Sequence, residues 1–430
     1  MGNRPGRRRT VLAVLSLALS ILPAHALGDH GTILCPQGQR CEFPTPSDCA
    51  QGDHTGVWDG GLPRGSVCVG AGGHNALYVG GEPTALCGAV IIGDLNVVDG
   101  PTTTDSSDPN KCPHGGWGAE VHDPFISKQD GVFYLFGTGP GLPIWRSTDL
   151  HTWRPSGRVF ADNVPAWAPS TVPGLNFPWA PDVSFFAGEW HVYYAISAFA
   201  TKNSAIGVAT NPTLDPRDPR YRWTDNGIVV QSGDTTDYNA IDPNVAFDKK
   251  GRPWLDFGSF WSGIKLAPID LATGKLSRST LQPLASRLVP TWGIEAPFVV
   301  RRGGYNYLFV SFDNCCRGSE STYNVRVGRS AKLGGPYVDD AGVPMLLGGG
   351  RVVLEASGDR RGPGHNAVLH DGRNWWLVFH YYDAADNGTA KLGILPIEWN
   401  AEGWPEVDWS DLRPANFVAQ NETAAEAPRP

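Results

Sequence analysis

The sequence has little positive charge and lacks long apolar runs beyond its N-terminal segment. Its 430 residues include 35 Lys and Arg against 43 Asp and Glu, which gives a formal net charge of −8 at pH 7. Nucleic acids and anionic membranes are bound by basic surfaces, so we expect neither as a partner. Outside the N-terminal segment, no stretch is long and apolar enough to span a bilayer. Sustained helical periodicity is also missing, which disfavours a helical fold.

The chain has no C-x-x-C pair with zinc-site spacing, so we expect no structural zinc. It does have eight cysteines, and six of them lie within residues 35–112. The N-terminus combines several arginines, a short apolar run and an A-x-A cleavage motif at residues 24–26, which is the pattern of a signal peptide. We therefore expect a secreted protein, in which an even number of cysteines indicates disulfides.

These features predict four segments. Residues 1–26 are the signal peptide, and residues 27–112 form a small disulfide-rich module whose function the sequence does not indicate. A core of that size needs covalent staples. Residues 113–412 form one large domain, and residues 413–430 are a C-terminal tail.

A five-fold repeat dominates the chain from residue 118 onward. Each unit has a polar residue, a short apolar strand, a turn and an aromatic-rich strand. The units are HDPFISKQDGVFYLFGTG, APDVSFFAGEWHVYYAIS, IDPNVAFDKKGRPWLDFGSF, EAPFVVRRGGYNYLFVSFD and GHNAVLHDGRNWWLVFHYYD. Their leading polar residues are Asp123, Asp182, Asp242, Glu295 and His365, at intervals of 59, 60, 53 and 70 residues. Repeats of this period with several strands each predict an all-β fold, a five-bladed β-propeller.

The leading polar residues of the five repeats are the candidate active-site residues. In a propeller the innermost strands line the axis, so their first residues converge although they are far apart in sequence. Crowded carboxylates are costly unless they share protons or bind a cation. Glycoside hydrolysis requires such a group, because one carboxyl protonates the leaving oxygen while another activates water or attacks the sugar. Asp123, Asp242 and Glu295 fit this need, whereas Asp182 fits a structural role equally well. Calcium binding or turn capping is the alternative explanation of these acids.

At these residues the chain resembles glycoside hydrolase family 43, and within it the endo-α-1,5-L-arabinanases. The resemblance covers residues 118–412 and depends on motifs in a fixed order. They are VHDPFI, WAPDV, NAIDPN, GSFWSGIKL, EAPF, YLFVSFDNCCRG, YNVRVGRS and GHNAV.

The resemblance implies roles for individual residues. It implies that Asp123 is the general base, Glu295 the general acid, and Asp242 the residue that tunes and orients the acid. It also implies inversion of configuration, with the base and acid carboxyls about 6.5–9.5 Å apart. His365 is implied in an axial calcium site whose other ligands are mostly water, and no organic cofactor is expected.

Further residues are implied to contact substrate. Trp179 and Phe199 are expected as aromatic platforms, and Asn239 and Ser259 as hydrogen-bond partners of furanose hydroxyls. Strand-edge packing or turn capping is the alternative for each. Cys315 and Cys316 are adjacent, and form either a vicinal disulfide or two buried thiols.

The expected activity is endo-hydrolysis of plant cell-wall arabinan or pectin side chains by a monomer. Two alternatives stay open. One is an exo-acting arabinofuranosidase or arabinobiohydrolase of the same fold, and the other is a non-catalytic carbohydrate-binding propeller. The cysteine-rich segment 27–112 is not required by the family, and it leaves the openness of the cleft undecided.

Overall fold

A computed structural model describes residues 120–287 and 293–418 with their side chains, and the backbone of six short strands before them. The chain divides into two compact units, Met1–Thr103 and Thr104–Pro430. The signal peptide and the disulfides predicted for residues 27–112 lie outside the described residues and side chains. None of the helices in the described part has the length and apolar character that a membrane span requires.

The first unit contains two small antiparallel sheets. One has the strand order β2-β1-β3-β4, and the other pairs β5 with β6. The strands are β1 (Thr32–Leu34), β2 (Arg40–Glu42), β3 (Ser66–Val69), β4 (Asn75–Tyr78), β5 (Ala89–Val90) and β6 (Val98–Asp99).

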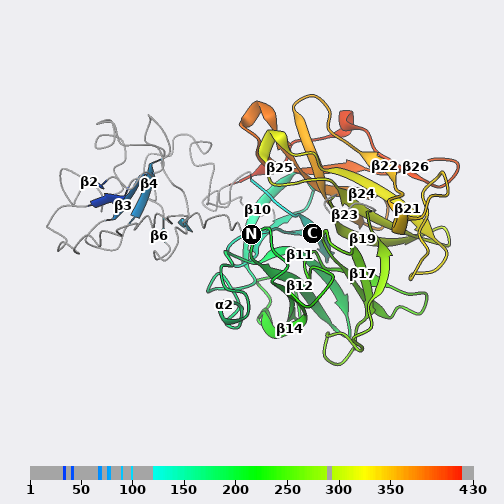
Figure 1. Cartoon of the computed structure of the whole chain (residues 1–430), viewed down its shortest axis with the longest axis horizontal. Helices are drawn as coiled ribbons and strands as arrows, with labels where there is room; N and C mark the ends of the chain where they lie inside the picture. Colours follow the sequence, from blue (N-terminus) through cyan, green and yellow to red (C-terminus); the bar gives the residue numbers. More distant parts are fainter. Residues whose placement is uncertain are drawn as a thin grey trace, which may run out of the picture. The chain divides into compact units, whose positions relative to one another are not determined.

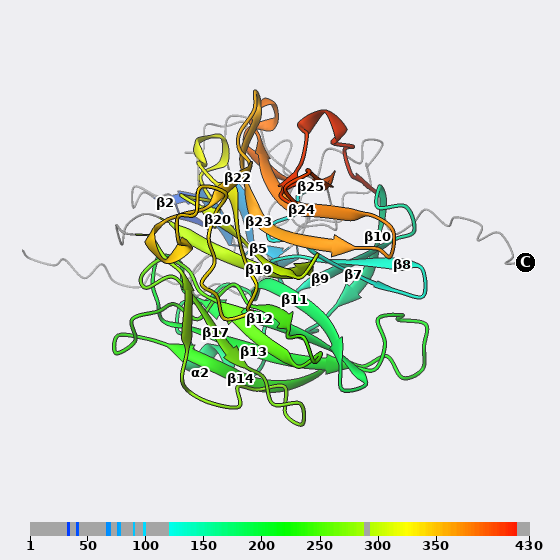
Figure 2. The same cartoon turned by 90° about the vertical axis from the view of Figure 1, so that its right-hand side faces the viewer.

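The second unit is a five-bladed β-propeller, which confirms the predicted fold (Figures 1 and 2). Blade one has β7 (Phe125–Gln129), β8 (Val132–Phe136), β9 (Pro143–Ser147) and β10 (Thr152–Arg158). Blade two has β11 (Trp179–Phe186), β12 (Glu189–Ser197), β13 (Ser204–Asn211) and β14 (Thr224–Ser232). Blade three has β15 (Asn244–Phe247), β16 (Pro253–Phe257), β17 (Ile264–Pro268) and β18 (Gln282–Ala285). Blade four has β19 (Ile294–Arg302), β20 (Tyr305–Phe312), β21 (Asn324–Ser330) and β22 (Arg351–Leu354). Blade five has β23 (Arg360–His370), β24 (Trp375–Asp383) and β25 (Thr389–Pro396).

The ring closes between the last and first blades. Each innermost strand, β7, β11, β15, β19 or β23, contacts the innermost strands of both neighbouring blades. In Figure 1 the colour runs around the ring from cyan at β10 through green to orange at β25. The short strand β28 (Asn416–Phe417) pairs in parallel with β10, so the sheet of blade one continues past residue 412, where the catalytic domain was predicted to end.

The remaining elements are short. They are α2 (Ala168–Thr171), η2 (Gly318–Glu320), η3 (Met345–Leu347), η4 (Ala384–Asp386), η5 (Trp409–Asp411), and the hairpin of β26 (Glu398–Trp399) and β27 (Pro405–Glu406).

The apolar core lies between the blades. Five clusters of buried side chains occur in the described residues, and each joins one blade to the next. Along a strand, successive side chains point to opposite faces. In β24, for example, Phe379 packs toward blade four and Val378 toward blade one. This explains why the middle strands read as continuous apolar runs, since both of their faces are buried.

The backbone bends just before or within each innermost strand. At this bend one residue of each blade has a left-handed backbone, with φ between 47° and 56°. These residues are Asp123, Ala180, Asp242, Ala296 and His365. The repeat alignment predicted from sequence is therefore offset in two blades, because Ala180 and Ala296 occupy the equivalent positions rather than Asp182 and Glu295. The strand register breaks at both places, between Trp179 and Asp182 and between Glu295 and Phe298.

Hydrogen bonds tie the bent residues to the preceding blade. In four of the five blades the backbone N–H of the bent residue donates to a side chain of that blade. The bonds are Ala180 to Thr138 Oγ1 (2.8 Å), Ala296 to Asp242 Oδ2 (3.0 Å), His365 to Ser311 Oγ (2.8 Å) and Asp123 to His380 Nδ1 (3.1 Å). Polar contacts of this kind therefore join four of the five pairs of neighbouring blades at the mouth of the propeller.

Candidate active site

Asp123 is a buried carboxylate surrounded by hydrogen-bond donors. Thr138 Oγ1 donates to its Oδ2 at 2.5 Å, and His122 Nδ1 donates to its Oδ1 at 2.8 Å. Nδ1 of His365 lies 3.1 Å from the same Oδ1. Burial alone would raise the pKa of Asp123, but the charges of His122 and His365 and the His122 hydrogen bond hold this pKa well below its usual range. Asp123 is therefore ionised at neutral pH.

Glu295 is also buried, but its pKa is shifted in the opposite direction. The hydroxyl of Ser259 donates to its Oε2 at 2.5 Å, and the hydroxyl of Tyr323 donates to its Oε1. Burial raises the pKa of Glu295 to about 7, against the effect of the Ser259 hydrogen bond and assisted by the charge of Asp123. A substantial share of Glu295 therefore keeps its proton near neutrality, as a proton donor requires.

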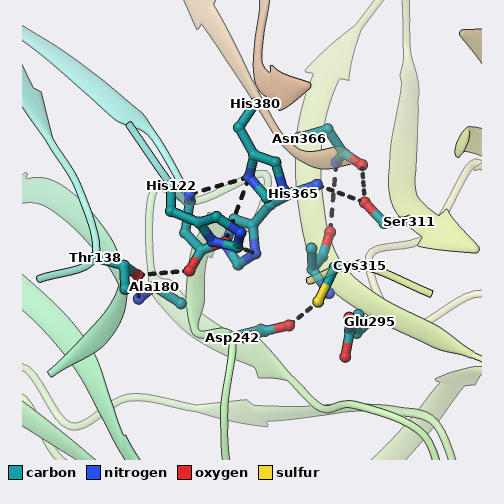
Figure 3. Close-up of polar contacts among 12 residues, drawn as sticks. His122, Thr138, Ala180, Asp242, Glu295, Ser311, Cys315, His365, Asn366 and His380 are labelled. Carbon is teal, nitrogen blue, oxygen red and sulfur yellow. Dashed lines mark hydrogen bonds and ion pairs between the residues drawn. The ribbon is translucent and has the colours of Figure 1, made fainter. Parts of the chain in front are cut away.

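Asp242 lies between blades three and four. Its Oδ2 accepts the backbone N–H of Ala296, the residue that follows Glu295. Burial raises the pKa of Asp242 well above its usual range, and the charges of Glu295 and Asp123 act in the same direction. The three predicted acids are thus brought into one electrostatically connected group, and Figure 3 shows Asp242 and Glu295 beside a cluster of histidines.

Asp182, the fourth acid of the repeat, has a structural environment. It is buried, and its carboxyl accepts hydrogen bonds from Asn244 Nδ2 at 2.7 Å and Ser184 Oγ at 3.2 Å. Burial raises the pKa of Asp182 to about 7. Ala180, and not Asp182, occupies the bent position of this blade. The hydrogen bond from Asn244 of blade three to Asp182 joins blades two and three.

The predicted substrate contacts divide into two groups. Trp179 is half-buried at the start of β11, and Phe199 is 69% exposed after β12, so both rings are accessible to a ligand. Ser259 is buried, and its hydroxyl donates a hydrogen bond to Glu295. Asn239 is 3% exposed, accepts a hydrogen bond from Ser204 and donates one to Thr201, so its amide is used within the protein.

Several residues of the site were missed from sequence. Next to Asp123, the ring of His122 stacks on His380 with centroids 3.9 Å apart, and Figure 3 shows these imidazoles together with His365. The adjacency of His122 to Asp123 was the one signal available. His380, Tyr382 and Tyr323 lie in aromatic strands that read as core.

The histidines are also the candidate metal ligands. Potential ligand atoms of His122, Asp123 and His380 lie within 4.8 Å of one another. His365 is not in this group, although its Nδ1 faces Asp123. Among the described residues, none hydrogen-bonds to its Nε2.

Cys315 and Cys316 are joined by a disulfide, so the vicinal alternative is the one found. The backbone N–H of Cys316 donates to the hydroxyl oxygen of Tyr382 at 2.8 Å. The disulfide therefore sits in a loop that is hydrogen-bonded to the histidine cluster.

Comparison with known proteins identifies the family of the chain. The model of a family described as glycosyl hydrolases family 43 matches residues 118–405. An extracellular exo-α-(1→5)-L-arabinofuranosidase of Cellvibrio japonicus is 43% identical over 308 residues, which are 68% of this chain and 88% of the relative. An extracellular endo-α-(1→5)-L-arabinanase of Bacillus subtilis is 40% identical over 298 residues, which are 67% of this chain and 89% of the relative. The structure of an α-L-arabinanase of Cellvibrio cellulosa in complex with arabinohexaose matches with a TM-score of 0.67 at 39% identity, and covers 70% of this chain and 99% of that chain.

Proposed function

Because the chain belongs to glycosyl hydrolase family 43, we propose that it hydrolyses arabinan at internal α-1,5-linked L-arabinofuranosyl bonds. One observation carries the proposal. The pKa values of two buried carboxyl groups are shifted in opposite directions, that of Asp123 well below its usual range and that of Glu295 up to about 7. Glycoside hydrolysis needs this division between a base and an acid.

In this mechanism Asp123 removes a proton from a water molecule that attacks the anomeric carbon. Glu295 donates its proton to the oxygen of the departing sugar. Displacement in one step inverts the configuration, which requires the two carboxyls to be about 6.5–9.5 Å apart. Trp179 and Phe199 supply accessible aromatic faces for neighbouring sugar rings.

Asp242 controls the acid, and its substitution tests this role. The reaction needs Glu295 protonated, so kcat/KM falls as the pH rises through about 7. Asp242 and Glu295 disfavour each other's ionisation. Both buried acids have raised pKa values, so the pair avoids a double negative charge and keeps one proton over a wide range of pH. In Asp242→Asn this repulsion is absent, so we expect Glu295 to lose its proton more easily and the falling limb of the pH profile to move to lower pH. A limb that stays in place would contradict this role.

Relatives act in both modes, so the alternative of exo action is kept. The Bacillus subtilis relative is named an endo-arabinanase and the Cellvibrio japonicus relative an exo-arabinofuranosidase. The acids of the site are intact in this chain, which disfavours the non-catalytic carbohydrate-binding alternative.

Product analysis on linear debranched arabinan decides between the modes, with arabinoxylan and xylan as controls. We expect a ladder of short arabino-oligosaccharides from the earliest time points, because an endo enzyme cuts at random internal bonds. A single mono- or disaccharide from the start would establish exo action instead. Absence of product from all three polysaccharides would contradict the proposed function.

A calcium ion beside His365 is the proposed cofactor. Calcium prefers oxygen ligands, and the carboxyl oxygens of Asp123 already accept hydrogen bonds from Thr138 and His122. The residues therefore fit calcium only with water as most of its ligands and Nε2 of His365 as a protein contact. A bound ion would add positive charge near the ionised base.

Chelation tests this ion. Prolonged dialysis against EDTA should lower the unfolding temperature together with kcat, and added calcium should restore both. His365→Ala, in which the proposed contact is absent, should show no further response to EDTA. An unfolding temperature unaffected by EDTA in the wild type would contradict a bound structural calcium.

We also propose that the protein is exported and acts as a monomer. Two relatives are named extracellular, in agreement with the signal peptide predicted for residues 1–26. Arabinan is a polymer of the plant cell wall that is met outside the cell, so export places the enzyme with its substrate.

A further inference from the structure

The loop between β16 and β17, residues 258–263, is hydrogen-bonded to the backbone beside two of the three acids. The N–H of Gly258 donates to the carbonyl of Ile241, and the N–H of Phe260 donates to the carbonyl of Ile294, both at 2.9 Å. Ile241 directly precedes one acid of the mouth, and Ile294 directly precedes another. The loop therefore lies at the mouth of the propeller, where blades three and four meet.

Trp261, in the middle of this loop, has a backbone conformation that bulky residues rarely adopt. Its φ is 37°, in the left-handed region, where a large side chain crowds the backbone. Phe260 is also left-handed, with φ of 49°, but its ring packs against Gly293, where an added Cβ would lie 2.8 Å from Cζ of Phe260. Trp261 is 38% exposed and belongs to none of the five apolar clusters. Packing within the described residues therefore does not explain why a tryptophan is held in this conformation.

Hydrogen bonds just after Trp261 hold the loop in place. The N–H of Ser262 donates to the carbonyl of Asp237 at 3.0 Å. Nζ of Lys265, a residue that is only 7% exposed, donates to the carbonyl of Ser262 at 3.0 Å. A strained backbone persists only where the surrounding structure imposes it, and such strain is concentrated at ligand-binding sites. The anchored loop thus holds an accessible indole in a fixed position at the mouth.

The same loop contacts the proton donor of the proposed mechanism. Two residues before Trp261, the hydroxyl of Ser259 donates to Oε2 of Glu295 at 2.5 Å. Glu295 protonates the oxygen of the departing sugar, whereas the base activates water on the opposite face of the cleaved sugar. Trp261 therefore lies on the side of the site that receives the departing part of the polymer.

We propose that Trp261 is a substrate-binding residue that provides an aromatic face for a sugar on the departing side of the cleaved bond. This inference rests on the proposed function, because it takes arabinan as the substrate and Glu295 as the acid. A sugar ring has apolar C–H surface, and covering the exposed indole with it removes apolar area of both from water. Since the loop is already fixed, little freedom is lost when the sugar binds.

A binding measurement separates this role from any effect on the acid. In the Glu295→Gln background the acid is absent, so the Kd for arabinohexaose, measured by isothermal titration, reports contacts with the sugars alone. Trp261→Asn in this background should weaken the Kd about ten-fold, as expected when partial burial of an aromatic side chain is lost. Trp261→Phe keeps an aromatic ring and should retain most of the affinity. A Kd that is the same with Trp261 and with Asn would overturn the proposal.

The unfolding temperature distinguishes a binding role of Trp261 from a structural one. Asparagine tolerates a left-handed backbone better than tryptophan does. If the strain serves binding, Trp261→Asn should unfold at the same temperature as the wild type or at a higher one. A clear drop in the unfolding temperature would assign the indole to the stability of the fold and would overturn the proposal.

Kinetics test the side of the cleaved bond on which the indole acts. On arabinan the departing group is a sugar chain, whereas on 4-nitrophenyl α-1,5-L-arabinobioside it is 4-nitrophenol. Trp261→Asn should lower kcat/KM on arabinan about ten-fold and lower it much less on the aryl substrate, which has no sugar on the departing side. Equal losses on the two substrates would contradict the proposed position.

An exposed ring elsewhere on the propeller supplies the matched control. Phe185 is 52% exposed and lies near the end of β11 that is remote from the mouth. Phe185→Ala should leave the Kd and kcat/KM on both substrates unchanged. The proposed function fails separately, because a wild type that releases no product from arabinan contradicts it whatever the Trp261 variants show. An active wild type whose affinity does not depend on Trp261 overturns the further inference alone.

Discussion

Replacing Asp123 with Asn should lower kcat on arabinan about 10²–10⁴-fold, the usual contribution of a general base. Asparagine has the size of aspartate and tolerates the left-handed backbone of this position, where φ is 50°. It carries no charge and cannot accept a proton from water. The apolar clusters that hold the propeller together lie between the blades, so we expect the unfolding temperature to change little.

The loss in Asp123→Asn should not depend on the leaving group. The attacking water needs the base whichever sugar or alcohol departs, so turnover of 4-nitrophenyl α-1,5-L-arabinobioside should fall as much as turnover of arabinan. Asp130→Asn, at the exposed turn between β7 and β8, is the matched control and should behave like the wild type. Near-normal turnover in folded Asp123→Asn would remove Asp123 from the role of base.

The order of blades and the place of the chemistry could be predicted from the sequence. The five repeats fall on β7 and β8, β11 and β12, β15 and β16, β19 and β20, and β23 and β24. The closed ring then brings Asp123, Asp242 and Glu295 together from three blades. Periodicity and the cost of crowded carboxylates were enough to make this prediction.

The offset within the repeat could not be predicted, because it depends on backbone conformation. Counting residues aligns Asp182 and Glu295 with Asp123. The left-handed residues show that Ala180 and Ala296 are the true equivalents. Asp182, two positions further along, turns into the protein toward Asn244. Glu295, one position earlier, still reaches the mouth because the register breaks directly after it.

The residues around Asp123 were missed for a related reason. In β24 the run Val378 to Tyr382 reads as a buried strand, and it is one. Alternation puts Val378, His380 and Tyr382 on the face toward blade one, and the ring then brings that face against His122 and Asp123. Sequence shows the alternation but not which neighbouring blade a face will meet. Such contacts join residues far apart in the chain, because Asp123 and His380, for example, are separated by 257 residues.

The substitution Glu295→Gln should lower kcat on arabinan about 10²–10⁴-fold, as expected for a general acid. Its dependence on the substrate should differ from that of Asp123→Asn. An arabinan oxygen leaves only with a proton, whereas 4-nitrophenolate is stable without one. Turnover of 4-nitrophenyl α-1,5-L-arabinobioside by Glu295→Gln should therefore stay close to that of the wild type, with the exposed Glu320→Gln as the matched control.

The pH profile of Glu295→Gln provides a second readout of the same role. In the wild type we expect kcat/KM to fall above a pH of about 7, because Glu295 loses the proton that it must donate. Glutamine does not titrate, so on the aryl substrate the variant should keep its kcat/KM as the pH rises through this range. Equal losses on both substrates, or a falling limb that persists in the variant, would mean that Glu295 does not protonate the leaving group. The proton donor would then have to be sought in Asp242, the other buried acid of the mouth whose pKa is raised.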